Sequence, residues 1–133
     1  MLTITRETRQ PDYSFSCPGK LLKTNDQEDL TPARDKGVFC RACSHLLTRE
    51  SEAVSPQGSH EHTFFNPAGV LYELCCFAKA PGVVTTGLPS TEFSWFAGYS
   101  WQIGYCKHCG THLGWHFSHT GHAFYGLIKK KLM

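Results

Sequence analysis

Two cysteine pairs are the residues of this 133-residue chain whose spacing most directly suggests chemistry. Cys40 and Cys43 form one Cys-x-x-Cys pair, and Cys106 and Cys109 form another, with 62 residues between the pairs. Each pair can turn two thiolates toward a common point, and four thiolates suit a tetrahedral zinc ion. Because four cysteines leave no coordination position for water, the pattern predicts one structural zinc per chain.

The cysteine spacing also allows other interpretations. The pairs could be unrelated thiols or a thioredoxin-type redox motif, although such a motif normally opens a helix in a β-α-β unit and none is evident. Cys17, Cys75 and Cys76 bring the total to seven. An odd number of cysteines in a chain without a secretory signal favours reduced thiols. Cys75 and Cys76 are adjacent in an expected strand, so we expect them to be core thiols facing opposite sides.

All three tryptophans lie in or beside the segment that contains the second cysteine pair. Trp101 and Trp115 fall on expected strands that flank this pair, so a bound metal would hold their backbones in register. Trp95 lies in a polar, glycine-containing loop. Tryptophans are most often core residues, but three indoles at a junction of loop and strands would also form a flat-walled box for a ring-shaped ligand.

Four histidines follow the second pair and resemble a metal cluster by composition: His112, His116, His119 and His122. Alternation along the expected strand places Leu113, Trp115 and Phe117 on one face. The histidines at 112 and 116 would then lie on the opposite face. The alternation therefore argues against a second metal site at these histidines.

The elements that position these residues are short strands. Apolar and aromatic stretches alternate with glycine and proline after residue 37, and no window has a sustained helical period, so the domain is predicted to be all-β. Asn-Pro-Ala-Gly at 66–69 predicts a turn after the strand HTFF. Residues 1–36 hold 12 of the 24 charged residues and three prolines, which indicates a loosely ordered arm before one domain at 37–133.

Charge and hydropathy exclude several classes of protein. The formal net charge is only +2. Lys79 and Lys107 are the only lysine or arginine residues between Arg49 and Lys129, so a basic groove for nucleic acid is not expected. The amino-terminal residues lack the apolar run of a secretory signal, and no segment has transmembrane length. We therefore expect a cytoplasmic protein with no membrane partner.

Three stretches carry a resemblance to a known family: HTFFNPAGVLYE, GLPSTEFSWFAGYSWQIGYCKHCGTHLGWHF and FYGLI. Together they resemble the thalidomide-binding domain of cereblon, also called the CULT domain, over about residues 38–127. The chain is most similar to the stand-alone bacterial members. The resemblance implies two antiparallel sheets set at an angle and pinned by the zinc, a β-tent.

The resemblance also implies a ligand site in which the three tryptophans wall a small pocket above Phe117. The family binds a cyclic imide such as glutarimide, or a uracil-type ring, through the backbone of the loop at 93–95. The animal proteins have histidine where this chain has Phe93, so one side-chain hydrogen bond is lost and we expect the backbone to sustain binding. The implied ligand-binding residues are Asn66, Pro67, Phe93, Ser94, Trp95, Trp101, Trp115 and Phe117.

Two other functions would use the same cysteines and tryptophans. R-specific methionine sulfoxide reductases share a zinc knuckle pair, but they need a late reactive cysteine and none follows Cys109, so we expect no enzyme. An aromatic cage for a methylated ammonium group remains open, because indoles attract cations and Glu92 could add a carboxylate. Protein ends that carry a cyclic imide are possible partners, and the segments that connect cereblon to a ubiquitin ligase are not expected here.

Overall fold

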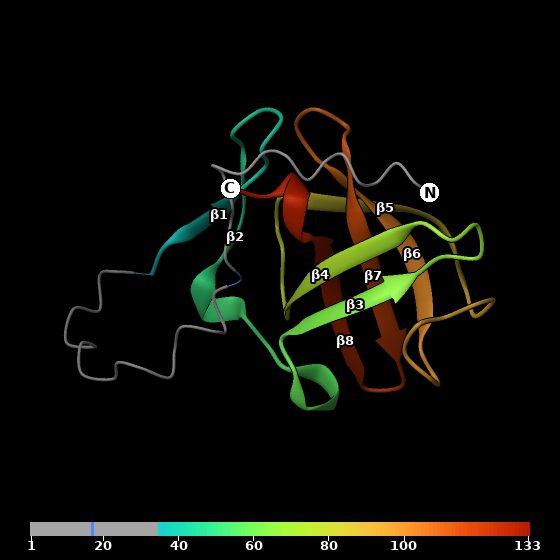
Figure 1. Cartoon of the computed structure of the whole chain (residues 1–133). Coiled ribbons are helices and arrows are strands. Elements are labelled where there is room, and N and C mark those ends of the chain that lie inside the picture. Colours follow the sequence, from blue (N-terminus) through green and yellow to red (C-terminus); the bar gives the residue numbers. More distant parts are fainter. Residues whose placement is uncertain (1–16, 18–34) are drawn as a thin grey trace.

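The computed structural model describes residue 17 and residues 35–133 (Figure 1). The prediction of an all-β domain is confirmed, because the described part contains strands and only three-residue helical turns. The strands are β1 (Gly37–Phe39), β2 (Leu46–Arg49), β3 (Glu61–Phe65), β4 (Leu71–Phe77), β5 (Val83–Ser90), β6 (Ser100–Cys106), β7 (His112–His119) and β8 (His122–Ile128). The 3-10 turns are η6 (Glu50–Glu52), η7 (Pro56–Gly58) and η8 (Lys129–Lys131).

The strands form two antiparallel sheets, as predicted. β1 and β2 make a two-stranded sheet, and the other six strands make a sheet with the order β3-β4-β8-β7-β6-β5. None of the described helical turns has the length and apolar character needed to cross a membrane. The predicted arm lies outside the described residues except for Cys17, Asp35 and Lys36, so the boundary at residue 37 stays a prediction.

The six-stranded sheet separates two clusters of core residues. Alternation along β4 shows this directly, because Leu74 and Cys76 belong to one cluster while Cys75 and Phe77 belong to the other. We call the first the aromatic core (Leu74, Cys76, Phe96, Phe117, Phe124 and Ile128). We call the second the cysteine-side core (Cys17, Val38, Cys40, Leu47, Cys75, Phe77, Ala80, Val83, Cys106, Leu113, Leu127 and Leu132).

A β-bulge in β7 changes which residues face the aromatic core. Gly104 of β6 pairs with Gly114, but the next residue, Tyr105, pairs with His112, so Leu113 is the extra residue. The bulge needs glycine at 114, where φ is 153° and a Cβ would collide with the carbonyl oxygen of Gly126. Because of this extra residue, the side chains of β7 do not alternate strictly between the two faces of the sheet.

The predicted faces of β7 are therefore partly wrong. Leu113 lies in the cysteine-side core rather than beside Trp115 and Phe117. His112 lies on the aromatic side, with its ring 4.9 Å from that of Trp115. His116, beyond the bulge, faces the other side as predicted and packs on Tyr125, with ring centroids 4.6 Å apart.

The spare cysteines also differ in part from the prediction. Cys17 and Cys75 form a disulfide across 58 positions of sequence, so the expectation that Cys75 is a reduced thiol is wrong. An odd cysteine count could not reveal this pair, because proximity of Cys17 to β4 is a tertiary property. Cys76 is a free, buried core thiol as predicted, and burial raises its pKa to about 12.

Candidate functional site

The four predicted zinc ligands come together at one end of the domain. Cys40 Sγ lies 3.8 Å from Cys109 Sγ, and Cys43 Sγ lies 3.7 Å from Cys106 Sγ. All four sulfur atoms lie within 4.8 Å of one another. Zinc–sulfur bonds of about 2.3 Å in a tetrahedron require sulfur–sulfur edges of about 3.8 Å. The sulfur positions therefore match a structural zinc site, as the spacing predicted.

The two knuckles use the same backbone turn. Ser44 N–H donates to the carbonyl of Cys40 at 2.7 Å, and Gly110 N–H donates to the carbonyl of Cys106 at 2.9 Å. Both Ser44 (φ 67°) and Gly110 (φ 81°) adopt positive φ to close the turn. In Figure 1 the loop between β1 and β2 and the loop between β6 and β7 lie side by side. The metal thus links the small sheet to the large one.

The surroundings of the zinc cysteines shift the pKa values of Cys109 and Cys43 in opposite directions. Hydrogen bonding to Thr111, whose Oγ1 lies 3.1 Å from Cys109 Sγ, lowers the pKa of Cys109 to about 6. Burial raises the pKa of Cys43 to about 12. The amide N–H groups of His108 and Cys109 donate to Cys106 Sγ at 3.4 and 3.5 Å. Four neighbouring thiolates would repel one another, so a bound divalent cation is needed to stabilise all four in the deprotonated form.

Trp95 is held by the hairpin between β3 and β4. Its Nε1–H donates to the carbonyl of Phe65 at 3.0 Å. Its ring stacks on Phe64, with centroids 5.0 Å apart and planes 6° apart, and meets Trp115 edge to face at 4.8 Å. Asn66 fixes the end of this hairpin, because its Oδ1 accepts from the amides of residues 68 and 70 at 2.9 Å each. The predicted turn at 66–69 is confirmed, and it bears on the position of Trp95.

The other two tryptophans are fixed from β6 and β7. Trp101 Nε1–H donates to the carbonyl of Glu92 at 2.8 Å, which ties the start of β6 to the preceding loop. Trp115 meets the ring of Tyr72 at 5.1 Å. Phe117 is the cross-strand neighbour of Trp101 and is buried. The three tryptophans therefore pack against one core, with Phe117 inside it.

The loop between β5 and β6 supplies the remaining predicted residues. Phe93 has φ 56° and its side chain is 72% exposed. Ser94 Oγ donates to the carbonyl of Phe96 at 3.1 Å. Phe96 is fully buried and contacts Phe117 at 4.8 Å between ring centroids. This loop thus holds the exposed Phe93 within a tight turn and the buried Phe96 three positions later.

Sequence reasoning missed several aromatic neighbours of the tryptophans. Alternation in HTFF could have found Phe64, and alternation in VLYEL could have found Tyr72. No sequence signal separates Phe96 from Phe93, and the bulge hid His112. Burial lowers the pKa of His112, so its ring is favoured in the neutral form beside Trp115. The predicted residue Pro67 lies exposed at the hairpin end.

A family model described as "Yippee zinc-binding/DNA-binding /Mis18, centromere assembly" matches residues 37–131. The chain belongs to the Yippee-Mis18 family. The match spans both knuckles and every strand of the described domain, which supports assignment of the four cysteines to a zinc site.

The chain is also similar in sequence to cereblon proteins. Protein cereblon of Gallus gallus is 40% identical over 107 residues, which cover 72% of this chain and 23% of the relative. Protein cereblon of Drosophila grimshawi is 41% identical over 117 residues, or 88% of this chain and 16% of the relative. These matches confirm the resemblance seen in the sequence. The chain spans less than a quarter of the length of these relatives.

Proposed function

We propose that this chain is a non-enzymatic binding module whose tryptophan cluster recognises a neutral cyclic imide or a uracil-type ring. The observation that supports this most is that the indole N–H groups of Trp95 and Trp101 are both engaged by backbone carbonyls. These indoles are therefore held as flat walls that offer ring faces, and hydrogen bonding to a ligand falls to other groups. A ring that carries its own polar edge complements such walls.

The turn at 93–95 offers suitable backbone groups. Ser94 N–H is used inside the turn, where it approaches the carbonyl of Thr91 at 3.4 Å. Within the described part of the chain, the Phe93 carbonyl and the Trp95 amide have no hydrogen-bond partner. An imide edge presents carbonyl, N–H and carbonyl in a row, so the Phe93 carbonyl could accept from the imide N–H and the Trp95 amide could donate to one imide carbonyl.

A cage for a methylated ammonium group is the second candidate. It needs a carboxylate near the indole faces to add to the cation–π attraction. The backbone carbonyl of Glu92 accepts from Trp101, which places this residue beside the indole, but Glu92 is exposed. Water screens an exposed carboxylate and weakens its attraction for a cation, which favours the neutral ligand.

Cys76 is poorly suited to thiol chemistry, because it is buried and its pKa is raised to about 12, which disfavours a reactive thiolate. This supports a binding module rather than a thiol enzyme. We also propose a cytoplasmic location, where thiol reductants would meet the Cys17–Cys75 disulfide and the pair would be open to reduction.

The imide N–H is expected to be the deciding group. N-methylglutarimide should bind roughly 5- to 150-fold more weakly than glutarimide. The bound ligand would cover the Phe93 carbonyl, and leaving a covered carbonyl without its donor costs about 1–3 kcal/mol. Isothermal titration calorimetry measures both affinities on the zinc-loaded chain, and Trp115→Ala should weaken both ligands. Equal affinity for the two imides, or tighter binding of trimethyl-lysine, would overturn the imide proposal.

A further inference from the structure

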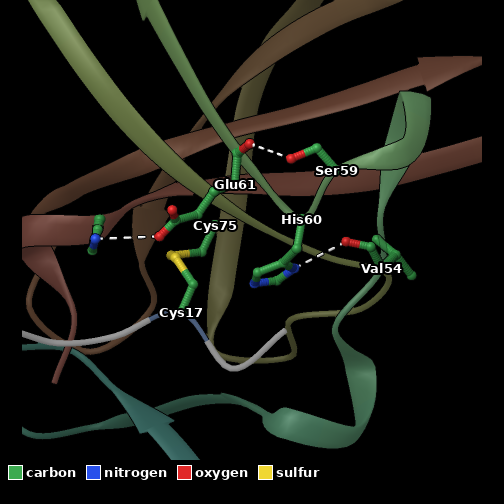
Figure 2. The surroundings of a disulfide bond; sticks show 7 residues. Cys17, Val54, Ser59, His60, Glu61 and Cys75 are labelled. Atoms are coloured by element: carbon green, nitrogen blue, oxygen red, sulfur yellow. Dashed lines mark hydrogen bonds and ion pairs between the residues drawn. A yellow bond between two sulfur atoms is a disulfide. The ribbon is translucent and has the colours of Figure 1, made fainter. Parts of the chain in front are cut away.

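A second group of side chains that could bind a metal ion contains none of the four zinc cysteines. Cys17, His60 and Cys75 are all buried, and their ligand atoms lie within 4.8 Å of one another (Figure 2). We propose that these three residues form a redox-gated site for a soft divalent metal ion such as zinc. The disulfide between Cys17 and Cys75 is the closed state, and the reduced pair with His60 is the state that binds the ion.

The orientation of His60 suits a metal ligand. Its Nδ1 lies 2.9 Å from the carbonyl of Val54, and a carbonyl can only accept, so Nδ1 carries the proton. The lone pair of the neutral ring is then on Nε2, and Figure 2 shows that the ring nitrogen away from Val54 is on the side of the disulfide. Metal-binding histidines are commonly oriented by this kind of bond to a backbone carbonyl.

The position of His60 is also fixed by the sheet. The amide of Cys76 donates to the carbonyl of His60 at 3.1 Å, which holds the backbone of the histidine beside that of Cys75. The ring of His60 meets Phe77 edge to face, with centroids 5.4 Å apart. His60 therefore faces the sulfur atoms because of its surroundings, and this placement does not depend on a bound ion.

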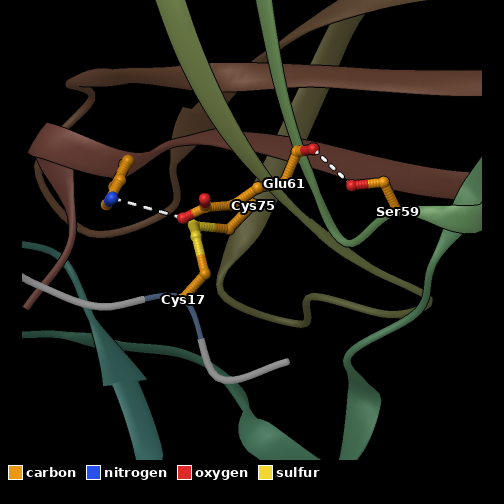
Figure 3. Close-up of polar contacts among 5 residues, drawn as sticks. Cys17, Ser59, Glu61 and Cys75 are labelled. Carbon is orange, nitrogen blue, oxygen red and sulfur yellow. Dashed lines mark hydrogen bonds and ion pairs between the residues drawn. A yellow bond between two sulfur atoms is a disulfide. The ribbon is translucent and has the colours of Figure 1, made fainter. Parts of the chain in front are cut away.

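The charges around the cluster are compatible with a thiolate-bound cation. Glu61 is the cross-strand partner of Cys75, and its carboxylate pairs with Lys129 Nζ at 3.2 Å (Figure 3). Two thiolates and one neutral imidazole around a divalent ion carry no net charge, so burial of the loaded site is less costly than burial of free thiolates. Sulfur and imidazole ligands together favour soft or borderline ions over calcium or magnesium.

The gating step balances as an ordinary thiol–disulfide exchange. A cellular dithiol supplies two electrons and two protons, the Cys17–Cys75 bond breaks to give two thiols, and the dithiol becomes a disulfide. Zinc then forms two bonds to sulfur and one to His60 Nε2, and the two thiol protons pass to solvent. The sulfurs need to separate only from about 2.0 Å, as in any disulfide, to about 3.8 Å around zinc.

Metal counting on the full-length chain tests the proposal. Protein with the disulfide intact is incubated with excess zinc, desalted and analysed, and an identical sample is first reduced with a phosphine. We expect one zinc per oxidised chain and two per reduced chain, with mass spectrometry reporting the state of the disulfide. A reduced chain that still holds only one zinc would refute the second site.

Variants locate the second ion. Cys75→Ser and His60→Gln should each hold the reduced chain at one zinc, whereas Cys76→Ser, a change at the neighbouring residue on the opposite face, should leave two. The first zinc shows that a variant has kept its fold, and if Cys75→Ser does not fold, the comparison of oxidised and reduced unaltered chain still decides. A second zinc retained by reduced His60→Gln or Cys75→Ser would contradict the ligand set.

Discussion

Replacing Cys106 with serine is expected to give a chain that loses zinc and does not fold. Cys106 Sγ accepts from two knuckle amides and lies 3.7 Å from Cys43 Sγ, so the change removes a metal ligand at the centre of the site. Structural zinc sites contribute about 10–16 kcal/mol of binding free energy. This is comparable with the whole stability of a typical domain, about 5–15 kcal/mol. Zinc analysis and circular dichroism of the purified chain measure the outcome.

Cys76→Ala is the matched control for this change. Cys76 is as deeply buried as Cys106 but lies in the aromatic core, away from the zinc cysteines. Its loss should cost about 1–2 kcal/mol, as expected for a small cavity, and the zinc content should be unchanged. A Cys106→Ser chain that folds with a full equivalent of zinc would show that the metal is not needed for the fold.

Phe96→Ala is expected to destabilise the domain by about 3–5 kcal/mol, the usual cost of removing a buried phenylalanine. Phe96 is fully buried, and its ring meets those of Phe64, Phe117 and Phe124 at 5.2, 4.8 and 5.0 Å. Because the neighbouring Trp95 stacks on Phe64, the cavity should also loosen the indole and weaken ligand binding. Urea unfolding of the zinc-loaded chain, followed by circular dichroism, gives the free energy.

Phe93→Ala provides the comparison within the same loop. The two phenylalanines are three positions apart, but Phe93 is 72% exposed, so its truncation should change stability by no more than about 0.5 kcal/mol. Similar losses from both substitutions would mean that the loop is not packed as described.

The zinc site could be predicted from the sequence because its geometry is largely local. A Cys-x-x-Cys knuckle places its own two sulfurs, and only the meeting of the two pairs depends on the rest of the fold. The turn at 66–69 was predictable for the same reason, since Asn66 Oδ1 bonds to amides two and four residues ahead. The all-β class followed from strand-like patterning that the sheet order of the structure bears out.

The features that escaped prediction depend on contacts between distant segments. The bulge at Leu113 exists because Gly114 lets β7 approach the backbone of Gly126, a residue of another strand. The Cys17–Cys75 disulfide joins residues 58 positions apart. Trp95 is oriented by the carbonyl of Phe65, 30 positions earlier in the chain. Residue types and hydrophobic periodicity do not reveal which distant segments come into contact.

The division of the large sheet into an aromatic face and a cysteine-bearing face gives each side its own natural reporter. All three tryptophans of the chain pack against the aromatic core, whereas Cys40, Cys106 and the partly buried Cys43 belong to the other side. Indole fluorescence therefore follows the first layer during denaturation, and release of zinc to a chromogenic chelator follows the second. Superimposable curves would mark one cooperative unit, and separated curves would show that one layer melts while the other persists.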